Sequence, residues 1–394
     1  MPNPIDVTGN PGVQWTRAAG LVLGLLGLLL QASPVIGQAD LPVRPVQSGP
    51  PFLVMDQARD QCDRRDGPDT PAVAFRNAKG DIVLFASSYR NVPLAGPSLS
   101  RMRKVCGAGF AAAGNPEPDL LDDRTWIDGV YTEDGVNITA LGSASYIPHR
   151  HGRTCSAGPA RTDCWLNGIV GLKSTDGGMS FSYLSPPPNH LVLPPDDRFS
   201  DQVRVPRGYV WTTNLVLRDG WLNTLVRVRT HNGVSKTCLM RVSPKSAYSW
   251  EYWNGRAFAD IRDGGKNRCA PIGGRGNFPA RGLSFLPEQK LWLAVYDSRT
   301  PKDPPGRGVF YRVSRDLVEW SEPSMMLWVP LAKSRTTKGQ SFLMGYPSII
   351  DETSSDRNFG QIGKSFHVLH MEAYTDETGA TFRKLMATPF RLAP

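Results

Sequence analysis

The sequence predicts an all-β protein made of a repeated unit of about 70 residues. Three aromatic residues mark the repeat: Phe181, Trp250 and Trp320 are separated by 69 and 70 residues. Each one closes a similar short phrase, at 174–181, 243–250 and 314–320. A fixed period of this size is the mark of a repeat architecture.

The first phrase, Ser174-Thr-Asp176-Gly-Gly178-Met-Ser-Phe181, fits the pattern S-x-D-x-G-x-x-W/F, known as the Asp box. We expect Asp176 to accept hydrogen bonds from turn amides and Gly178 to supply a positive φ. The aromatic ring of Phe181 then enters the core. The phrase predicts a tight turn between two outer strands, with no chemistry of its own.

Strand-like runs recur in pairs along the chain, and each pair is joined by a turn. Asp-Gly at 134–135 and at 219–220 is a strong hairpin signal, because both central residues of such a turn need positive φ. The paired runs are 72–75 with 82–85, 129–131 with 138–141, 215–217 with 222–228, 283–285 with 291–296, and 348–350 with 366–369. A second hairpin follows each pair, so each unit has four strands.

Four strands per unit and about five units predict a five-bladed β-propeller with four antiparallel strands per blade. The chain has 34 Pro and 39 Gly, which argues against long helices, although short helices fit near 99–105 and 119–123. The alternative all-β interpretation is a sandwich, which does not explain the period.

The N-terminus has the pattern of a secretory signal peptide. Residues 21–30 form a ten-residue apolar stretch broken only by glycine, Arg17 precedes it, and small residues at 35–39 offer a cleavage site. A membrane-spanning helix needs about 20 residues. We therefore expect a secreted or periplasmic protein without a membrane span after cleavage; a signal anchor or a misplaced start is the alternative. The expected organisation is a signal peptide at 1–39, an extended arm at 40–60 and a single domain at 61–394.

The chain contains six cysteines, and an even number in an exported protein favours disulfides. Cys155 and Cys164 are nine residues apart, which favours a local bridge. Nearest-neighbour pairing then gives Cys62–Cys106 and Cys238–Cys269, although six cysteines allow 15 connectivities. No C-x2-C spacing occurs, so we expect neither a metal site nor a cofactor.

The formal net charge is +9, and the basic residues are spread along the chain, with no run longer than 101–104. Nucleic-acid binding requires a basic stripe or a motif, and neither is present. Attraction to anionic cell surfaces or acidic polysaccharides fits the charge better. We expect a monomer.

The unit count, together with the phrases at 314–323 and 345–351, resembles five-bladed glycoside hydrolases of the family 43 arabinanase and xylosidase type. The first two units are more similar to uncharacterised secreted bacterial members of that superfamily, on residues 68–75, 126–135 and 164–168. The resemblance covers most of residues 60–390. It implies a carbohydrate ligand in a central funnel and inverting hydrolysis by carboxyl groups about 6.5–9.5 Å apart.

The resemblance places Asp69 at the position of the catalytic base and Asp128 at that of a carboxyl that tunes its partner's pKa. Each of these also has a simpler interpretation, as an acid that binds turn amides. The general acid has no match, because 209–214 contains no Asp or Glu and Ser145 stands where a carboxylate is expected. A serine hydroxyl cannot donate a proton at the pKa this role requires. The alternative function is therefore a non-catalytic propeller that binds a glycan or a protein.

Several further residues are candidates for ligand binding at or near the first strands. Aromatic rings stack on the C–H faces of sugars, and an arginine can clamp a carboxylate sugar, although both residue types also pack between blades. These candidates are Trp126, Tyr146, Trp211, Asn214, Arg281 and Tyr346. A sialidase is a further alternative, but it requires an arginine cluster, a Tyr–Glu pair and several Asp boxes. His149 and His151 share a face if extended, but no third metal ligand lies near them in the sequence.

Overall fold

The computed structural model describes most of the chain after residue 42. The described ranges are 43–155, 164–203, 205–230, 233–246, 249–262, 269–274, 278–298, 308–328 and 341–393. The expected signal peptide lies outside them. Helix within these ranges is confined to α1 (Gln57–Asp60) and the 3-10 turns η2 (Leu99–Arg101), η3 (Pro118–Leu120) and η4 (Pro148–His151). The all-β prediction is therefore confirmed, and no helix in the described part is long and apolar enough to cross a membrane.

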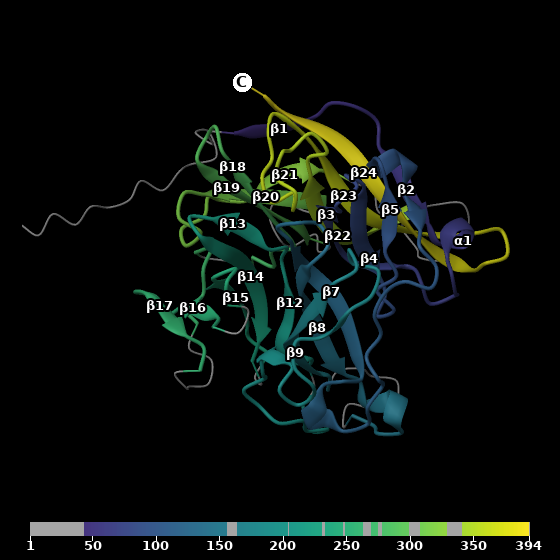
Figure 1. Cartoon of the computed structure of the whole chain (residues 1–394), viewed down its shortest axis with the longest axis vertical. Coiled ribbons are helices and arrows are strands. Elements are labelled where there is room, and N and C mark those ends of the chain that lie inside the picture. The colour runs from purple at the N-terminus through teal and green to yellow at the C-terminus, as the bar shows by residue number, and fades with distance from the viewer. Residues whose placement is uncertain are drawn as a thin grey trace, which may run out of the picture. The chain divides into compact units, whose positions relative to one another are not determined.

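The first two units are antiparallel meanders in which neighbouring strands are consecutive in the chain (Figure 1). The first unit contains β3 (Pro68–Arg76), β4 (Ile82–Ser87), β5 (Leu94–Gly96) and β6 (Arg103–Lys104). The second contains β7 (Arg124–Tyr131), β8 (Ile138–Tyr146), β9 (Leu166–Ser174) and β10 (Ser182–Tyr183), with β11 (Leu191–Leu193) also pairing with β9. The hairpins expected at 72–85 and 129–141 are β3–β4 and β7–β8.

The third unit begins with an interrupted strand. Its elements are β12 (Arg207–Thr212), β13 (Val216–Arg218), β14 (Trp221–Arg229), β15 (Ser235–Val242), β16 (Glu251–Trp253) and β17 (Phe258–Asp260). Both β12 and β13 pair with β14, one after the other along its length. The segment β12 and the first strand of the hairpin expected at 215–228, β13, are thus two parts of one broken strand. A short parallel pairing of β12 with β9 joins the second and third units into one sheet.

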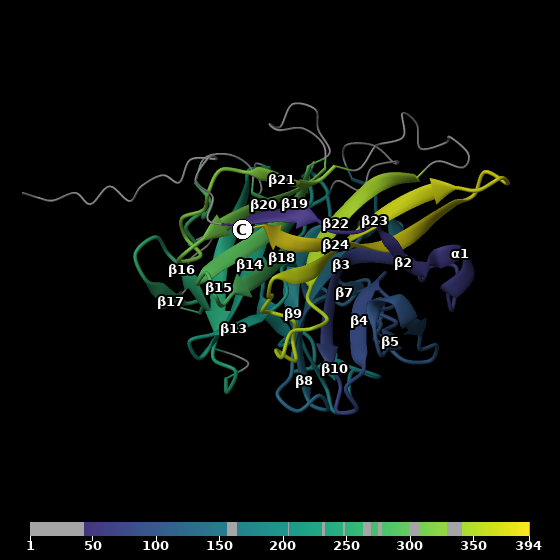
Figure 2. The same ribbon diagram turned by 90° about the horizontal axis from the view of Figure 1, so that it is seen from above.

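The last two units are separate sheets. The fourth contains β18 (Gly282–Leu286), β19 (Leu291–Ser298), β20 (Gly308–Ser314) and β21 (Ser324–Leu327). The fifth contains β22 (Ser341–Ile350), β23 (Ser365–Thr375) and β24 (Thr381–Ala393), and β24 also pairs with β1 (Arg44–Gln47) and β2 (Phe52–Asp56). The segment expected as an extended arm therefore supplies two strands to the sheet of the C-terminal strand (Figure 2).

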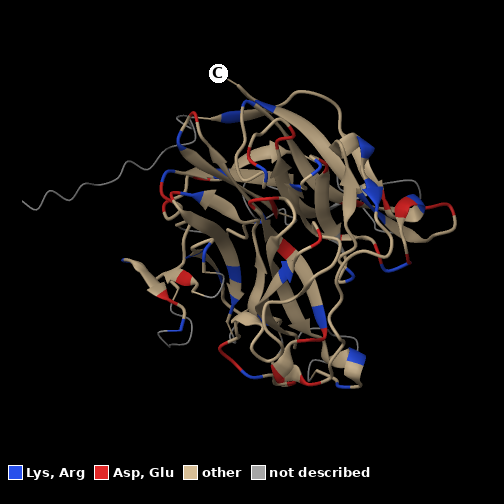
Figure 3. Cartoon of the chain, in the orientation of Figure 1, with Lys and Arg blue, Asp and Glu red and all other residues tan. Residues whose placement is uncertain are grey.

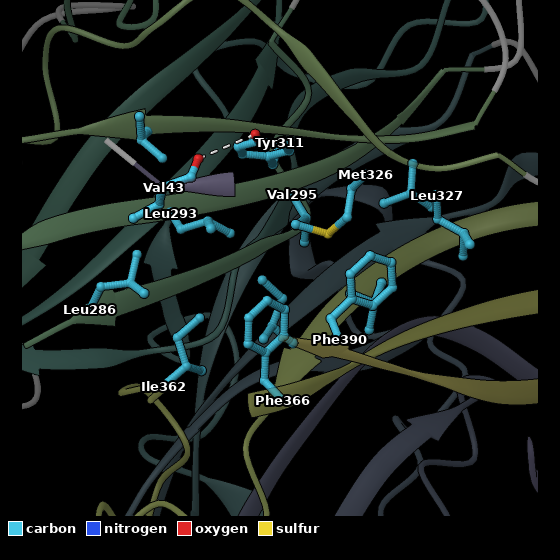
Figure 4. Close-up of a cluster of buried hydrophobic side chains, with 14 of the residues drawn as sticks. Val43, Leu286, Leu293, Val295, Tyr311, Met326, Leu327, Ile362, Phe366 and Phe390 are labelled. Atoms are coloured by element: carbon cyan, nitrogen blue, oxygen red, sulfur yellow. Dashed lines mark hydrogen bonds between the residues drawn. The ribbon is translucent and has the colours of Figure 1, made fainter. Parts of the chain in front are cut away.

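Each unit contacts the next one, and the last contacts the first. The contacts join β3 to β7, β8 to β12, β13 to β18, β19 to β22 and β22 back to β3. Five buried hydrophobic clusters lie between the same successive units. Figure 4 shows the cluster between the fourth and fifth units, where Val295 of β19 lies near Phe366 and Phe390, and the Tyr311 hydroxyl donates to the Val43 carbonyl at 3.4 Å.

The aromatic phrases form tight turns at the outer strands. Between β9 and β10, the Asp176 carboxylate accepts the backbone N–H groups of Met179 at 3.0 Å and Ser180 at 2.9 Å. Gly178 has φ +84°, and the Phe181 ring packs edge-on against Phe85 of the first unit. Asp316 makes equivalent bonds between β20 and β21, accepting the N–H groups of residues 318 and 319. Both aspartates thus accept backbone N–H groups within their own turns.

All six cysteines are paired. The disulfides join Cys62 to Cys106, Cys155 to Cys164, and Cys238 to Cys269, with Cα–Cα distances of 5.6, 5.7 and 5.8 Å. The nearest-neighbour pairing predicted from the spacing is therefore confirmed.

Candidate functional site

A cavity of about 390 Å³ lies where residues of all five units meet, and it is called the Asp69 cavity below. Most of the predicted site residues line it: Asp69 of β3, Trp126 and Asp128 of β7, Trp211 of β12, Arg281 immediately before β18, and Tyr346 of β22. Each unit contributes from its first strand or the residue before it, because the repeat places these strands in equivalent positions. Residues far apart in the sequence therefore line one site.

Two predicted ligand-binding residues do not line this cavity. Tyr146 is fully buried, and its ring stacks on His151 at a centroid distance of 5.4 Å. Asn214 lies in the break between β12 and β13. Its side-chain amide donates to the Leu283 carbonyl at 2.8 Å, and its oxygen accepts the Leu283 N–H at 2.9 Å. Tyr146 thus has a structural role in the core, and Asn214 links the third unit to the fourth.

Asp128 is the more buried of the two carboxyl groups in the cavity, with 3% of its surface exposed. The Ser143 hydroxyl donates to its Oδ2, and the Thr212 N–H approaches the same oxygen at 3.4 Å. Burial raises the pKa of Asp128 to about 7, although these two donors and the charge of Arg281 oppose the rise. The group is therefore partly protonated near neutral pH.

Asp69 is more accessible and forms an ion pair. Its Oδ1 lies 2.5 Å from Nη1 of Arg383, which reaches it from β24, and 27% of the Asp69 side chain is exposed. Burial within the cavity raises the pKa of this carboxyl, and the charge and hydrogen bond of Arg383 oppose the rise. The two acids thus differ: one is paired with a cation, whereas the other is held mainly by neutral donors.

Ser145 belongs to a buried chain of hydrogen bonds at the cavity wall. Its hydroxyl donates to Oδ1 of Asn167 at 2.7 Å, and the Asn167 amide donates to the Arg207 carbonyl at 2.7 Å. Ser143, Ser145 and Asn167 all line the cavity. Sequence reasoning missed Ser143 and Asn167, although alternation along a strand already places Ser143 on the face of Ser145.

Arg281 is held between two aromatic rings. Its guanidinium carbon lies 3.6 Å from the ring centroid of Trp211 and 4.9 Å from that of Tyr346. Its Nε is 3.5 Å from Oδ1 of Asp297, and the Trp211 indole donates to the Ala280 carbonyl at 3.0 Å. Such contacts fix the guanidinium at the wall of the cavity.

Three further acids near the first two strands of their units, Glu133, Asp297 and Glu372, are also possible proton donors from their positions in the sequence, but they lie outside the Asp69 cavity. Asp297 pairs with Arg281, Glu372 lies 3.1 Å from Nε2 of His370, and Glu133 accepts the Tyr131 hydroxyl at 3.4 Å. Each of these carboxyl groups already has a structural partner, so Asp69 and Asp128 are the acids that the cavity offers.

The paired histidines lie in a 3-10 turn and not in an extended strand. His149 and His151 belong to η4, and Nε2 of His151 is 3.2 Å from Oδ1 of Asp123. Their expected common face is therefore wrong. Among the described residues, no group of three His, Cys, Asp or Glu side chains has the arrangement of a metal site.

A larger cavity of about 450 Å³ lies between the second and third units. Its lining includes Leu191, Tyr209, Met240 and Tyr252, and none of the predicted catalytic or substrate-binding residues. The chemistry-bearing side chains gather in the smaller Asp69 cavity, which we therefore treat as the candidate site.

Comparison with known proteins gives structural similarity only. The chain matches no protein-family model and no curated protein sequence. An α-L-arabinofuranosidase from Lactobacillus brevis is 9% identical with a TM-score of 0.48, and the match covers 86% of this chain and 92% of that one. The Bacteroides ovatus protein described as xyloglucan PUL GH43B is 11% identical with a TM-score of 0.46; 88% of this chain matches, but only 54% of that one.

An N-acetylgalactosamine deacetylase from F. plautii, solved with blood group B trisaccharide, is 12% identical with a TM-score of 0.46. That match covers 87% of this chain and 94% of the deacetylase. At these identities and TM-scores, the similarities assign no activity to this chain.

Proposed function

We propose that the five strand units are the blades of one propeller and that residues 61–394 form a single domain around the Asp69 cavity. The ring of contacts supports this arrangement, because the fifth unit packs against the first. Strand β1 then closes the last blade by pairing with β24. Three disulfides are consistent with an exported monomer whose residues 1–39 are a signal peptide.

We propose that the Asp69 cavity binds a carbohydrate. The observation that carries this proposal is the convergence of aromatic rings with carboxyl, amide and guanidinium groups in one cavity. Trp126 offers a ring surface for the C–H faces of a sugar, Trp211 and Tyr346 hold the Arg281 guanidinium beside it, and Asp69 and Asn167 offer polar groups for the sugar hydroxyls. A volume of about 390 Å³ falls within the range of small-molecule sites, so a short saccharide fits best.

Hydrolysis of a glycosidic bond is the second candidate function, and the state of Asp128 favours it. The donors Ser143 and Thr212 both approach Oδ2, which leaves Oδ1 to carry the proton. A carboxyl with a pKa of about 7 is suited to general acid catalysis near neutral pH. Asp128 would then act as the general acid, a role that the Ser145 hydroxyl cannot fill.

The proposed step is an inverting displacement. Asp69 accepts a proton from water as the water oxygen bonds to the anomeric carbon, and Asp128 gives its proton to the leaving oxygen as the glycosidic bond breaks. The charge is balanced because one carboxyl gains the proton that the other loses. The Arg383 guanidinium stabilises the ionised form of Asp69 before the step.

The test measures binding and turnover separately. Purified protein is titrated with arabinan-, xylan- and sialic-acid-derived oligosaccharides, and released sugar is followed over time. We expect Asp69→Asn to slow any hydrolysis by about 10²–10⁴-fold with little change in affinity. The matched control is Asp219→Asn, at an exposed hairpin turn.

The outcomes separate the two functions. Binding without release of sugar identifies a glycan-binding propeller and eliminates the hydrolase. Turnover that survives Asp69→Asn removes Asp69 as the base. Binding of none of these saccharides contradicts the carbohydrate proposal itself.

A further inference from the structure

The wall of the Asp69 cavity formed by the third and fourth units is rich in arginine. Arg229 and Arg281 line the cavity, and Arg227 precedes Arg229 by two positions on β14, on the same face of the strand. In the ladder, Arg227 is opposite Trp211, whose ring covers the Arg281 guanidinium. These three arginines are called the guanidinium wall below.

The charges of Arg229 and Arg281 act on Arg227. Burial and the charges of Arg229 and Arg281 together lower the pKa of Arg227 to about 10. Burial also lowers the pKa of Arg229. Burial therefore disfavours the charged forms of Arg227 and Arg229. A bound anion would offset the free-energy cost of burying these charges.

The acids of the site leave the charge of Arg229 without a carboxylate partner among the described residues. Asp69 is paired with Arg383, and Asp297 is 3.5 Å from Arg281. Asp128 is partly protonated near neutral pH. Arg229 donates through Nε to the Ser235 hydroxyl at 3.3 Å, and no carboxylate among the described residues forms an ion pair with it. Arg229 is therefore a cation of the cavity wall whose charge no described carboxylate offsets.

The wall is also rigid. Arg281 is fixed between Trp211 and Tyr346, and its side chain is only 13% exposed. Tyr346 has φ +58°, a left-handed conformation that is unfavourable for an aromatic residue, and it follows Gly345 at φ +101°. The ladder of β22 with β23 shifts register on both sides of Gly345. Unusual backbone of this kind persists where the surrounding structure enforces it, often at a ligand site.

From these observations, we propose that the Asp69 cavity selects an anionic saccharide, and that its guanidinium wall binds the sugar's carboxylate. This inference rests on the proposed carbohydrate function and adds the substrate class. A carboxylate matches the planar fork of a guanidinium, and Arg229 supplies the unpaired cation. A sulfate group carries the same charge with a different shape, and the experiment distinguishes the two.

The test compares acidic and neutral sugars by isothermal titration calorimetry. The probes are short oligogalacturonides, xylo-oligosaccharides of matched length, and chondroitin oligosaccharides with and without sulfate. We expect the uronate sugars to bind more tightly than the neutral ones, with an affinity that falls as salt rises. Arg229→Gln should weaken uronate binding by about tenfold to a hundredfold, and Arg229→Lys by less.

Two further variants control for folding and for general charge. Arg218→Gln removes a cation near the β13–β14 turn, outside the Asp69 cavity, and should leave affinity unchanged. Arg281→Gln tests the second guanidinium. If it fails to fold, Arg229→Gln still decides the question, because Arg229 forms no ion pair with a described carboxylate whose loss would destabilise the fold.

Each result has one interpretation. Weaker uronate binding in Arg229→Gln with unchanged binding in Arg218→Gln supports the proposal. Equal affinity for neutral and acidic sugars overturns it while leaving carbohydrate binding intact, as does uronate binding unaffected by Arg229→Gln. A preference for sulfated over unsulfated chondroitin overturns the carboxylate assignment. Binding of no saccharide overturns the carbohydrate function and this inference together.

Discussion

Asp128 makes the stability of the folded protein depend on pH in a way that one substitution should remove. Its pKa is about 7 in the folded protein, against an ordinary value of 3.8. Each unit of difference corresponds to about 1.36 kcal/mol, so a shift of about 3 units corresponds to at most about 4 kcal/mol. The folded state holds this proton more tightly than the unfolded state. The stabilisation that comes from this proton is therefore fully present below about pH 4 and is lost as the pH rises towards about 7.

Asp128→Asn keeps an oxygen that can accept from Ser143 and Thr212, but it has no charge to bury. Urea unfolding of wild type and variant at pH 4 and pH 8 measures the effect. We expect the variant to gain about 3–4 kcal/mol relative to wild type between these two pH values. All other groups titrate in both proteins, so their contributions cancel in the difference.

Asp219→Asn is the matched control, because its side chain is 78% exposed at the β13–β14 turn. This substitution therefore removes a carboxylate from the surface without relieving the burial of a charge. A constant difference for Asp128→Asn across the same range would refute the reasoning, because it would mean that Asp128 ionises in the folded protein as easily as in the unfolded chain.

Three further outcomes follow from the turns, the break in the third unit and the disulfides. Asp176→Ala should lower stability by about 1–2 kcal/mol in chemical denaturation, because two turn N–H groups lose their acceptor, and should leave saccharide binding intact. Asn214→Ala should lower stability by about 1–3 kcal/mol in thermal unfolding, because both of its bonds to Leu283 are lost. Replacing Cys155 and Cys164 by alanine should cost about 2–3 kcal/mol, and peptide mapping of non-reduced wild type should recover the two linked to each other.

The strand pairs could be predicted because their signals are local. The Asp-Gly turn at 219–220 fixes the β13–β14 hairpin, and the short spacing of Cys155 and Cys164 fixes their bridge. The candidate site could also be located in part. The repeat puts residues near the start of each unit, such as Asp69 and Trp211, on equivalent strands, so they converge when the units pack together.

The exceptions have specific physical causes. Tyr146 follows Ser145 on β8, and successive side chains on a strand point to opposite faces, so Ser145 lines the cavity while Tyr146 enters the core. Asn214 falls where β12 ends, and its side chain takes over hydrogen bonding to the backbone of Leu283. The ion pair of Asp69 with Arg383 joins residues more than 300 positions apart, and no local pattern carries that information.

The guanidinium wall and the proton of Asp128 depend on each other. The charge of Arg281 opposes the raised pKa of Asp128, because a nearby cation favours the ionised carboxyl. An anionic sugar bound at the wall would offset that cation and keep Asp128 protonated. Ionisation of Asp128 above pH 7 would in turn repel the sugar, so acidic ligands should bind best where Asp128 still carries its proton. If the cavity binds an anionic sugar as we propose, it would thereby retain the proton on Asp128 that the proposed cleavage requires, even though Ser145 replaces the expected carboxylate.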